Sequence, residues 1–186
     1  MGGLLSSKIF PMSEEILDVV DEQDNLIGKE TRKKVHEVGL WHRGVHVFLF
    51  DEDGNLLIQK RSADRASNPL RLDCSVSEHV QSGESYQQAA IRGLKEEMGV
   101  ENIQIKKLAK FRMNYGINDN EISELYEGVV EPSDVKFDSE EIESVSYVSM
   151  DELRKMLKED ESKFCYWFVE ILKMYWGEEA KMYRME

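Results

Sequence analysis

Two adjacent glutamates, Glu96 and Glu97, stand near the end of a segment whose residues favour a helix. Position 93 precedes them by three and four residues, so positions 93, 96 and 97 share one helix face. Neighbouring carboxylates repel each other unless water solvates them or a cation is shared between them. Oxygen ligands of this kind suit Mg²⁺ or Mn²⁺ and phosphates bridged through the metal. A glutamate pair alone is more often a solvated surface, so the surrounding pattern has to decide.

The helix that would carry this pair has clear boundaries. Ser85 and Gln88 form a predicted capping box, and Gly99 is the residue expected to end the helix. Apolar side chains recur between them at helical spacing, as far as Leu94. A loop containing Gly83 leads into this segment. The sequence therefore predicts a loop followed by a helix, with the glutamates at the far end.

The pattern around this helix resembles the Nudix box: glycine, five residues, glutamate, seven residues, then Arg-Glu-apolar-x-Glu-Glu-x-Gly-apolar. The matching residues are Glu84, Arg92, Leu94, Glu96, Glu97, Gly99 and Val100. Two positions depart from the box. Glu78 stands where the box opens with glycine, and Gly93 stands where it has the glutamate of its Arg-Glu pair. The second departure removes a carboxylate and would reduce metal affinity or the number of metals bound.

The resemblance extends over roughly residues 17–175 and includes the type I isopentenyl-diphosphate isomerases. It is carried by residues 40–50 and 56–62, by Ser77 with His79, and by Trp167 with Phe168. The opening, with Val19-Val20-Asp21-Glu22 and Ile27-Gly28, is similar to bacterial Nudix hydrolases of the isomerase-like subgroup. The resemblance implies a Nudix fold, a mixed β-sheet sandwiched between helices.

Hydrophobic patterning along the chain agrees with an α/β or α+β domain. Apolar or alternating runs predict strands at residues 16–20, 26–30, 45–50, 55–58, 74–80, 103–111, 122–130 and 145–148. Residues 31–38 favour a helical turn or a loop, and Ser149 is predicted to cap a short helix. The last helix carries apolar side chains between Phe164 and Tyr175 on one face, which suits a core or a homodimer interface. We interpret residues 1–12 as a flexible tail and 13–186 as one domain.

Three of the four histidines match metal ligands of the isomerases. That resemblance implies a divalent metal bound by His36, His42, His79, Asp119 and Glu121. Asp119 replaces a glutamate, so its side chain is one methylene shorter. Three imidazoles with two carboxylates suit Mn²⁺, Zn²⁺ or Fe²⁺ better than Mg²⁺. His46 matches no ligand position and is interpreted as structural.

The resemblance also indicates a substrate-binding region. Arg61 and Arg65 match basic residues that bind diphosphate in the isomerases, and Arg32 is a weaker third candidate. Arginine pairs bidentately with phosphate oxygens. Trp167 matches the tryptophan that faces the substrate carbocation. The alternatives are that the arginines are solvated loop charges and that Trp167 belongs to the core.

Departures from the isomerases weigh against isomerase activity. Ser77 occupies the place of a cysteine that the isomerases use in protonating a carbon–carbon double bond. A hydroxyl is a far weaker acid than a thiol, whose pKa is about 8.5. Cys74 lies three residues earlier, an offset that places it on the opposite face of a regular strand. Met113 replaces the family's tyrosine.

The sequence therefore favours a metal-dependent hydrolase that cleaves a diphosphate linkage in a small molecule, such as a nucleoside phosphate. A divalent ion lowers the pKa of the attacking water, and a carboxylate acts as general base. Glu97 is the best metal ligand, and Glu96 or Glu121 is a ligand or the base. The alternatives are a type I isomerase and a non-catalytic diphosphate-binding module.

Composition limits the partners. The chain has 186 residues and a net charge of -13, from 37 acidic and 24 basic residues, which disfavours a nucleic-acid duplex as a ligand. Apolar runs long enough to span a membrane are lacking, so we expect no membrane partner. With two cysteines, Cys74 and Cys165, a disulfide framework is not expected, which predicts a reduced, cytoplasmic protein.

Overall fold

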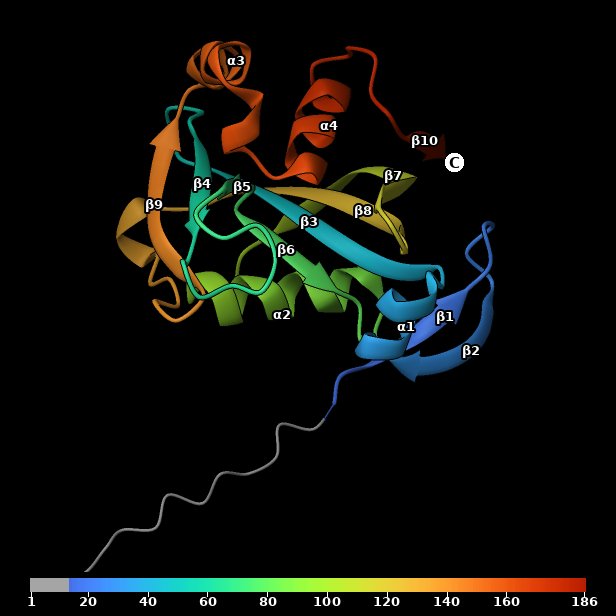
Figure 1. Cartoon of the computed structure of the whole chain (residues 1–186). Helices are drawn as coiled ribbons and strands as arrows, with labels where there is room; N and C mark the ends of the chain where they lie inside the picture. Colours follow the sequence, from blue (N-terminus) through green and yellow to red (C-terminus); the bar gives the residue numbers. More distant parts are fainter. Residues whose placement is uncertain (1–13) are drawn as a thin grey trace, which may run out of the picture.

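A mixed β-sheet forms the centre of the structure, a computed structural model that describes residues 14–186 (Figure 1). The strands are β1 (Ile16–Val20), β2 (Leu26–Thr31), β3 (His42–Phe50), β4 (Leu56–Arg61), β5 (Leu72–Asp73), β6 (Val76–His79), β7 (Ile105–Gly116), β8 (Asp119–Val129), β9 (Ile142–Val148) and β10 (Tyr183–Met185). The helices are α1 (Arg32–Val38), α2 (Tyr86–Met98), α3 (Met150–Glu159) and α4 (Tyr166–Tyr175). Short 3₁₀ turns lie at Pro132–Asp134 and Glu161–Lys163. The tail predicted at residues 1–12 lies outside the described residues.

The pairing of the strands brings distant residues to one end of the sheet. Its order is β10-β7-β8-β3-β4-β5, with β6 paired to β3 and β9 paired to β4, while β1 and β2 form a separate hairpin. β3 runs parallel to β8 and antiparallel to β4 and β6. In this register His42 lies opposite Glu121, and Gly44 lies opposite His79. Strands β3, β6 and β8 therefore carry His42, His79 and Glu121 to the same place.

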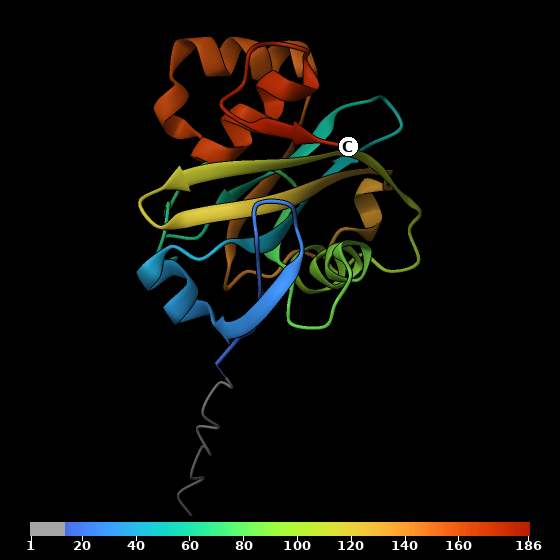
Figure 2. The same cartoon turned by 90° about the vertical axis from the view of Figure 1, so that its right-hand side faces the viewer.

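Helices cover both faces of the sheet. Helix α2 covers one face, and α3 with α4 covers the other (Figures 1 and 2). The side chains of β3 alternate between the two cores. Val45 and Val47 pack with Leu94 of α2, whereas Phe48 packs with Phe168 of α4. The predicted fold class, a mixed sheet sandwiched between helices, is confirmed.

The predicted helix boundaries hold at α2 and α3. Ser85 accepts a hydrogen bond from the Gln88 backbone, the Gln88 side chain completes the capping box, and Gly99 ends α2 with a φ of 65°. Ser149 caps α3 by accepting from the backbone N–H of Glu152. Residues 31–38, predicted as a helical turn or a loop, contain the short helix α1, whose first turn Thr31 caps.

The strand predicted at residues 74–80 is interrupted. β5 ends at Asp73 and β6 begins at Val76, so simple alternation does not apply across this segment. Ser75 stabilises the break: its hydroxyl donates to the Leu57 carbonyl and accepts from the backbone N–H of Leu49. The prediction that Cys74 lies on the opposite face from Ser77 is wrong, because Cys74 Sγ is 3.1 Å from Ser77 Oγ.

Strands β7 and β8 are longer than predicted. They form a hairpin that continues to Gly116 and resumes at Asp119, so that Tyr115 and Asp119 lie at its tip. Cross-strand pairing of polar residues, including a hydrogen bond between Asn114 and Asn120, extends the ladder beyond the apolar segments. Within residues 14–186, no helix combines the length and the apolar character that crossing a membrane requires.

Candidate metal centre and active site

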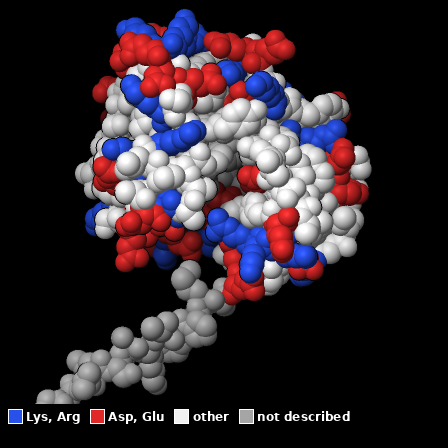
Figure 3. All heavy atoms as spheres, viewed as in Figure 1, with Lys and Arg blue, Asp and Glu red and all other residues white. Residues whose placement is uncertain are grey.

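A pocket of about 790 Å³ lies at the end of the sheet to which β3, β6 and β8 carry their polar residues. Figure 3 shows the hollow near the middle of one face, with acidic and basic side chains around it. Most residues predicted for the site line this pocket: Arg32, His36, Arg61, Arg65, Ser77, His79, Glu96, Asp119, Glu121 and Trp167. His42 and Glu97 are both buried beside it.

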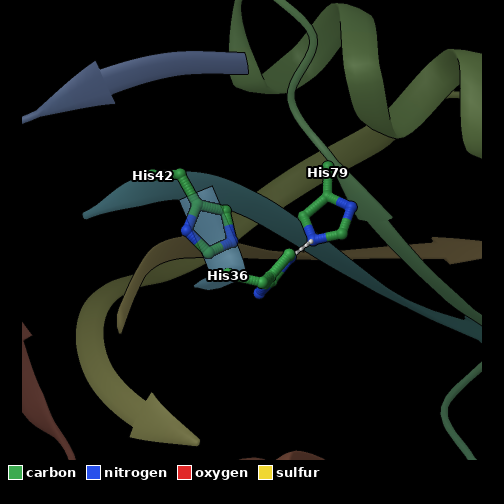
Figure 4. Close-up of side chains that lie close together, drawn as sticks. All are labelled: His36, His42 and His79. Carbon is green, nitrogen blue, oxygen red and sulfur yellow. Dashed lines mark hydrogen bonds between the residues drawn. The ribbon is translucent and has the colours of Figure 1, made fainter. Parts of the chain in front are cut away.

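Three imidazoles converge beside the pocket (Figure 4). His36 comes from α1, His42 from β3 and His79 from β6, and a ligand nitrogen of each lies within 4.8 Å of the other two. His36 Nε2 is 3.3 Å from His79 Nε2. These three residues, which we call the histidine cluster, could hold a metal ion.

The hydrogen bonds of the histidine cluster direct its nitrogen lone pairs inward. His42 Nδ1 lies 3.2 Å from the Leu40 carbonyl, to which it can donate, while His42 Nε2 is buried without a hydrogen-bond partner. A buried nitrogen without a partner is costly unless something else binds it. Burial, with the charge of His42, holds the pKa of His79 well below its usual value, so this imidazole is neutral near pH 7. Neutral imidazoles with inward lone pairs fit a divalent metal.

Glu121 places a buried carboxylate beside His42 of this cluster. Its Oε2 lies 3.7 Å from His42 Nε2, and its Oε1 lies 3.5 Å from His46 Nε2. Burial alone would raise the pKa of Glu121, but the hydrogen bond and charge of His46, with the charge of His42, lower it to about 2. Gly44 makes room for this carboxylate, since a Cβ atom there would lie 2.3 Å from it. Glu121 is therefore ionised and available as a ligand.

Asp119 contacts the cluster from outside. Its Oδ1 lies 3.3 Å from His36 Nδ1, the ring nitrogen other than the one that faces His79. A carboxylate in this position accepts the Nδ1 proton and orients the ring. In this geometry Asp119 faces the outer nitrogen of the His36 ring.

A hydrogen-bonded group forms the floor of the pocket. His46 Nδ1 lies 3.0 Å from Ser77 Oγ, and His46 Nε2 lies 3.2 Å from Tyr115 Oη. Both His46 and Tyr115 line the pocket, and sequence reasoning missed Tyr115 and interpreted His46 as purely structural. The signal was present, because His42, Gly44 and His46 alternate along β3 and therefore share one face.

Glu96 and Glu97, near the end of α2, have side chains in different surroundings. The Glu97 side chain is buried, with its residue only 5% exposed; its Oε2 accepts from Gln59 at 2.8 Å, and its Oε1 has no partner. Burial and the charge of Glu78 raise the pKa of Glu97 well above its usual value. Glu96 lines the pocket, with 58% of its side chain exposed, and lies 3.2 Å from Arg92.

The arginines predicted to bind the substrate already have carboxylate partners. Arg61 Nη1 lies 3.1 Å from Asp73, whose other oxygen accepts from Trp167 Nε1 at 2.7 Å. The Arg61 guanidinium also lies 5.6 Å from the centre of the Trp167 ring. Arg65 is 2.7 Å from Glu141, and Arg32 is 3.4 Å from Glu15. A phosphate would have to share these arginines with the carboxylates or displace them.

Comparison with known proteins shows the family. The family model described as NUDIX domain matches residues 40–168, and the chain belongs to the Nudix family. An uncharacterized Nudix hydrolase of Clostridium acetobutylicum is 34% identical over 158 residues, covering 78% of this chain and 75% of that protein. An isopentenyl-diphosphate delta-isomerase of Photorhabdus laumondii is 32% identical over 165 residues, covering 86% of this chain and 91% of that protein.

A crystal structure of a Deinococcus radiodurans protein superposes with a TM-score of 0.76 at 27% identity. The superposition covers 86% of this chain and 98% of the Deinococcus radiodurans chain. The Nudix and isopentenyl-diphosphate isomerase families generally use divalent metals. The family is thus shown by sequence and fold together, and it includes both hydrolases and isomerases among the relatives of this chain.

Proposed function

We propose that this protein is a metal-dependent Nudix hydrolase that cleaves a diphosphate linkage in a small molecule such as a nucleoside di- or triphosphate. The observation that carries the proposal is His42 Nε2, buried without a partner where His36 and His79 converge. This nitrogen is explained by a bound metal. The net charge of -13 disfavours a nucleic-acid duplex, and we expect the protein to act in the cytoplasm on a small molecule.

The histidine cluster and Glu121 would hold Mn²⁺ or Zn²⁺, since imidazole nitrogen suits these ions. Glu97 offers only oxygen atoms as ligands, and oxygen ligands suit Mg²⁺ or Mn²⁺. A divalent ion, when bound, lowers the pKa of water and offsets phosphate charge. Asp119 orients His36 from outside the ligand set.

The general base is assigned to Glu96. A base has to reach the pocket, and Glu96 lines the pocket with an exposed side chain. Glu121, with a pKa of about 2, is a much weaker base and serves better as a ligand. Arg32, Arg61 and Arg65 would bind the phosphates, and Trp167 with Ser77 would contact the rest of the substrate.

A panel of nucleoside di- and triphosphates and other diphosphate compounds, assayed with Mg²⁺, Mn²⁺ and Zn²⁺, tests the proposal. Phosphorus NMR identifies the bond that breaks. We expect Glu96→Gln to lower kcat by about 100-fold while metal content is unchanged. Glu101→Gln is the matched control, because Glu101 is an exposed glutamate just beyond the same helix, paired with Lys95. The proposal fails if no compound yields product above the rate of heat-inactivated protein.

One observation favours a second function, isopentenyl-diphosphate isomerase. Cys74 Sγ lies 3.1 Å from Ser77 Oγ and 3.9 Å from His46 Nδ1, directly beneath the pocket floor. Against it, burial and the charge of Asp73 raise the pKa of the Cys74 thiol well above its usual value. Incubation with isopentenyl diphosphate in D₂O distinguishes the two functions, because an isomerase incorporates deuterium and a hydrolase does not.

A further inference from the structure

The two departures from the Nudix box lie in contact with each other. The box has glycine at the position of Glu78 and glutamate at the position of Gly93, so this chain carries the same two residue types in exchanged places. A Cβ atom on Gly93 would lie 2.9 Å from Glu78 Cγ and 2.6 Å from Val76 Cγ1. No side chain fits at position 93 while Glu78 occupies that space.

We propose that this exchange conserves a metal-binding carboxylate: Glu78 supplies from β6 the group that the box places on the helix, and Glu78 with Glu97 binds one divalent cation. This cation site is separate from the histidine cluster. Its role in bridging substrate phosphates rests on the proposed hydrolase function, whereas the binding of the cation does not.

The surroundings of Glu97 call for a cation. Glu97 follows Gly93 by four residues, one helical turn, and therefore lies along the same face of α2 that Glu78 covers. Among the described residues, its buried Oε1 has no hydrogen-bond partner. A buried carboxylate oxygen without a partner is costly unless a positive charge lies against it. Gln59 donates one hydrogen bond to Glu97 but brings no charge.

Pairing with Arg92 does not by itself explain Glu78. Arg92 Nη1 lies 2.9 Å from Glu78, but Glu84 already binds the same guanidinium through both of its oxygens, at 2.9 and 3.1 Å. Glu84 therefore offers a matched control. Replacing it removes the same charge from the same arginine without touching the surface of Gly93.

The test is a Mn²⁺ titration of the full-length protein, followed by the EPR signal of free Mn²⁺. The histidine cluster is first filled with one equivalent of Zn²⁺, which favours imidazole over an all-oxygen site. We expect the Zn²⁺-loaded protein to bind one further Mn²⁺. Glu78→Gln should weaken this binding by about tenfold or more, and Glu84→Gln by less than about twofold. Equal effects of the two variants, or no Mn²⁺ bound by the parent, would overturn the proposal.

The exchanged variant Glu78→Gly/Gly93→Glu provides the reciprocal test. It returns the carboxylate to the helix and removes the Glu78 side chain, one of the two that would clash with it; Val76, whose Cγ1 would lie 2.6 Å from the new Cβ, has to shift. We expect Mn²⁺ affinity within about threefold of the parent. A folded double variant that binds no better than Glu78→Gln contradicts the proposal. If the double variant does not fold in thermal melts, the comparison of Glu78→Gln with Glu84→Gln decides. The Mn²⁺ titrations contain no substrate, so a negative result in them is distinguishable from a negative result in the hydrolase assays.

Discussion

His36 and His79 are 43 residues apart and come from different elements, whereas Glu96 and Glu97 are neighbours on one helix. The separated imidazoles have ligand nitrogens 3.3 Å from each other. The adjacent glutamates diverge, one buried against Gln59 and the other exposed in the pocket. Successive helix residues project about 100° apart, whereas paired strands place residues side by side by register. Whether two side chains meet in this site therefore depends on the register of the strands and on how the elements pack. Their separation in the sequence matters little.

Among the variants of this site, the removal of one imidazole is expected to weaken metal binding the most. His42 is fully buried and its Nε2 has no hydrogen-bond partner among residues 14–186, so His42→Ala takes away a proposed ligand that none of these residues replaces. We expect Zn²⁺ affinity to fall by at least about 100-fold, which equilibrium dialysis with elemental analysis measures. His46→Gln is the control, because His46 is a buried histidine of the same strand outside the cluster. Equal loss in both variants would contradict the assignment of the cluster as the ligand set.

A smaller effect is expected from Gly44, which gives the Glu121 carboxylate its space. Gly44→Ala would bring a Cβ within 2.3 Å of that carboxylate, so Glu121 has to move. We expect the free energy of unfolding to fall by about 2 kcal/mol and Zn²⁺ binding to weaken. Gly28→Ala is the matched control, because its nearest neighbour would lie 4.0 Å away. Denaturant unfolding of both variants measures the difference; similar stabilities would show that Glu121 relaxes without cost.

Replacement of Asp119 is expected to weaken metal binding less than replacement of His42. Because Asp119 contacts Nδ1 of His36, we expect it to orient this proposed ligand instead of binding the metal. Asp119→Asn keeps a hydrogen-bond acceptor and loses the charge, so we expect Zn²⁺ affinity to fall by about tenfold. The titration used for His42→Ala measures it. A loss as large as that of His42→Ala would instead make Asp119 a direct ligand.

The sequence predicted the fold, whereas the contacts within the candidate site depend on packing that it does not encode. The capping box at Ser85 and the end of α2 at Gly99 are local signals, and the structure confirms both. The contact between Glu78 and Gly93 depends on how β6 packs against α2, which no local pattern encodes. The same holds for Glu97, whose burial against Gln59 depends on the position of β4.

The position of Cys74 shows a different kind of failure. Alternation along a strand is reliable only while the strand is continuous, and the chain leaves the ladder between Asp73 and Val76. That irregular step turns Cys74 toward Ser77. Ser75, which stabilises the break through the backbone of β3 and β4, gives no sign of this role in the sequence.

The smallest expected effect is the reaction of the cysteines with a thiol reagent such as DTNB. Cys74 and Cys165 are fully buried, and burial with the charge of Asp73 raises the pKa of both thiols. Since the thiolate is the reactive form, we expect neither cysteine to react in the native protein at pH 8, and both to react in guanidinium. Rapid labelling of one thiol, lost in Cys74→Ser and retained in Cys165→Ser, would show that the floor opens beneath Ser77. That result would make Cys74 available as an acid and would favour the isomerase.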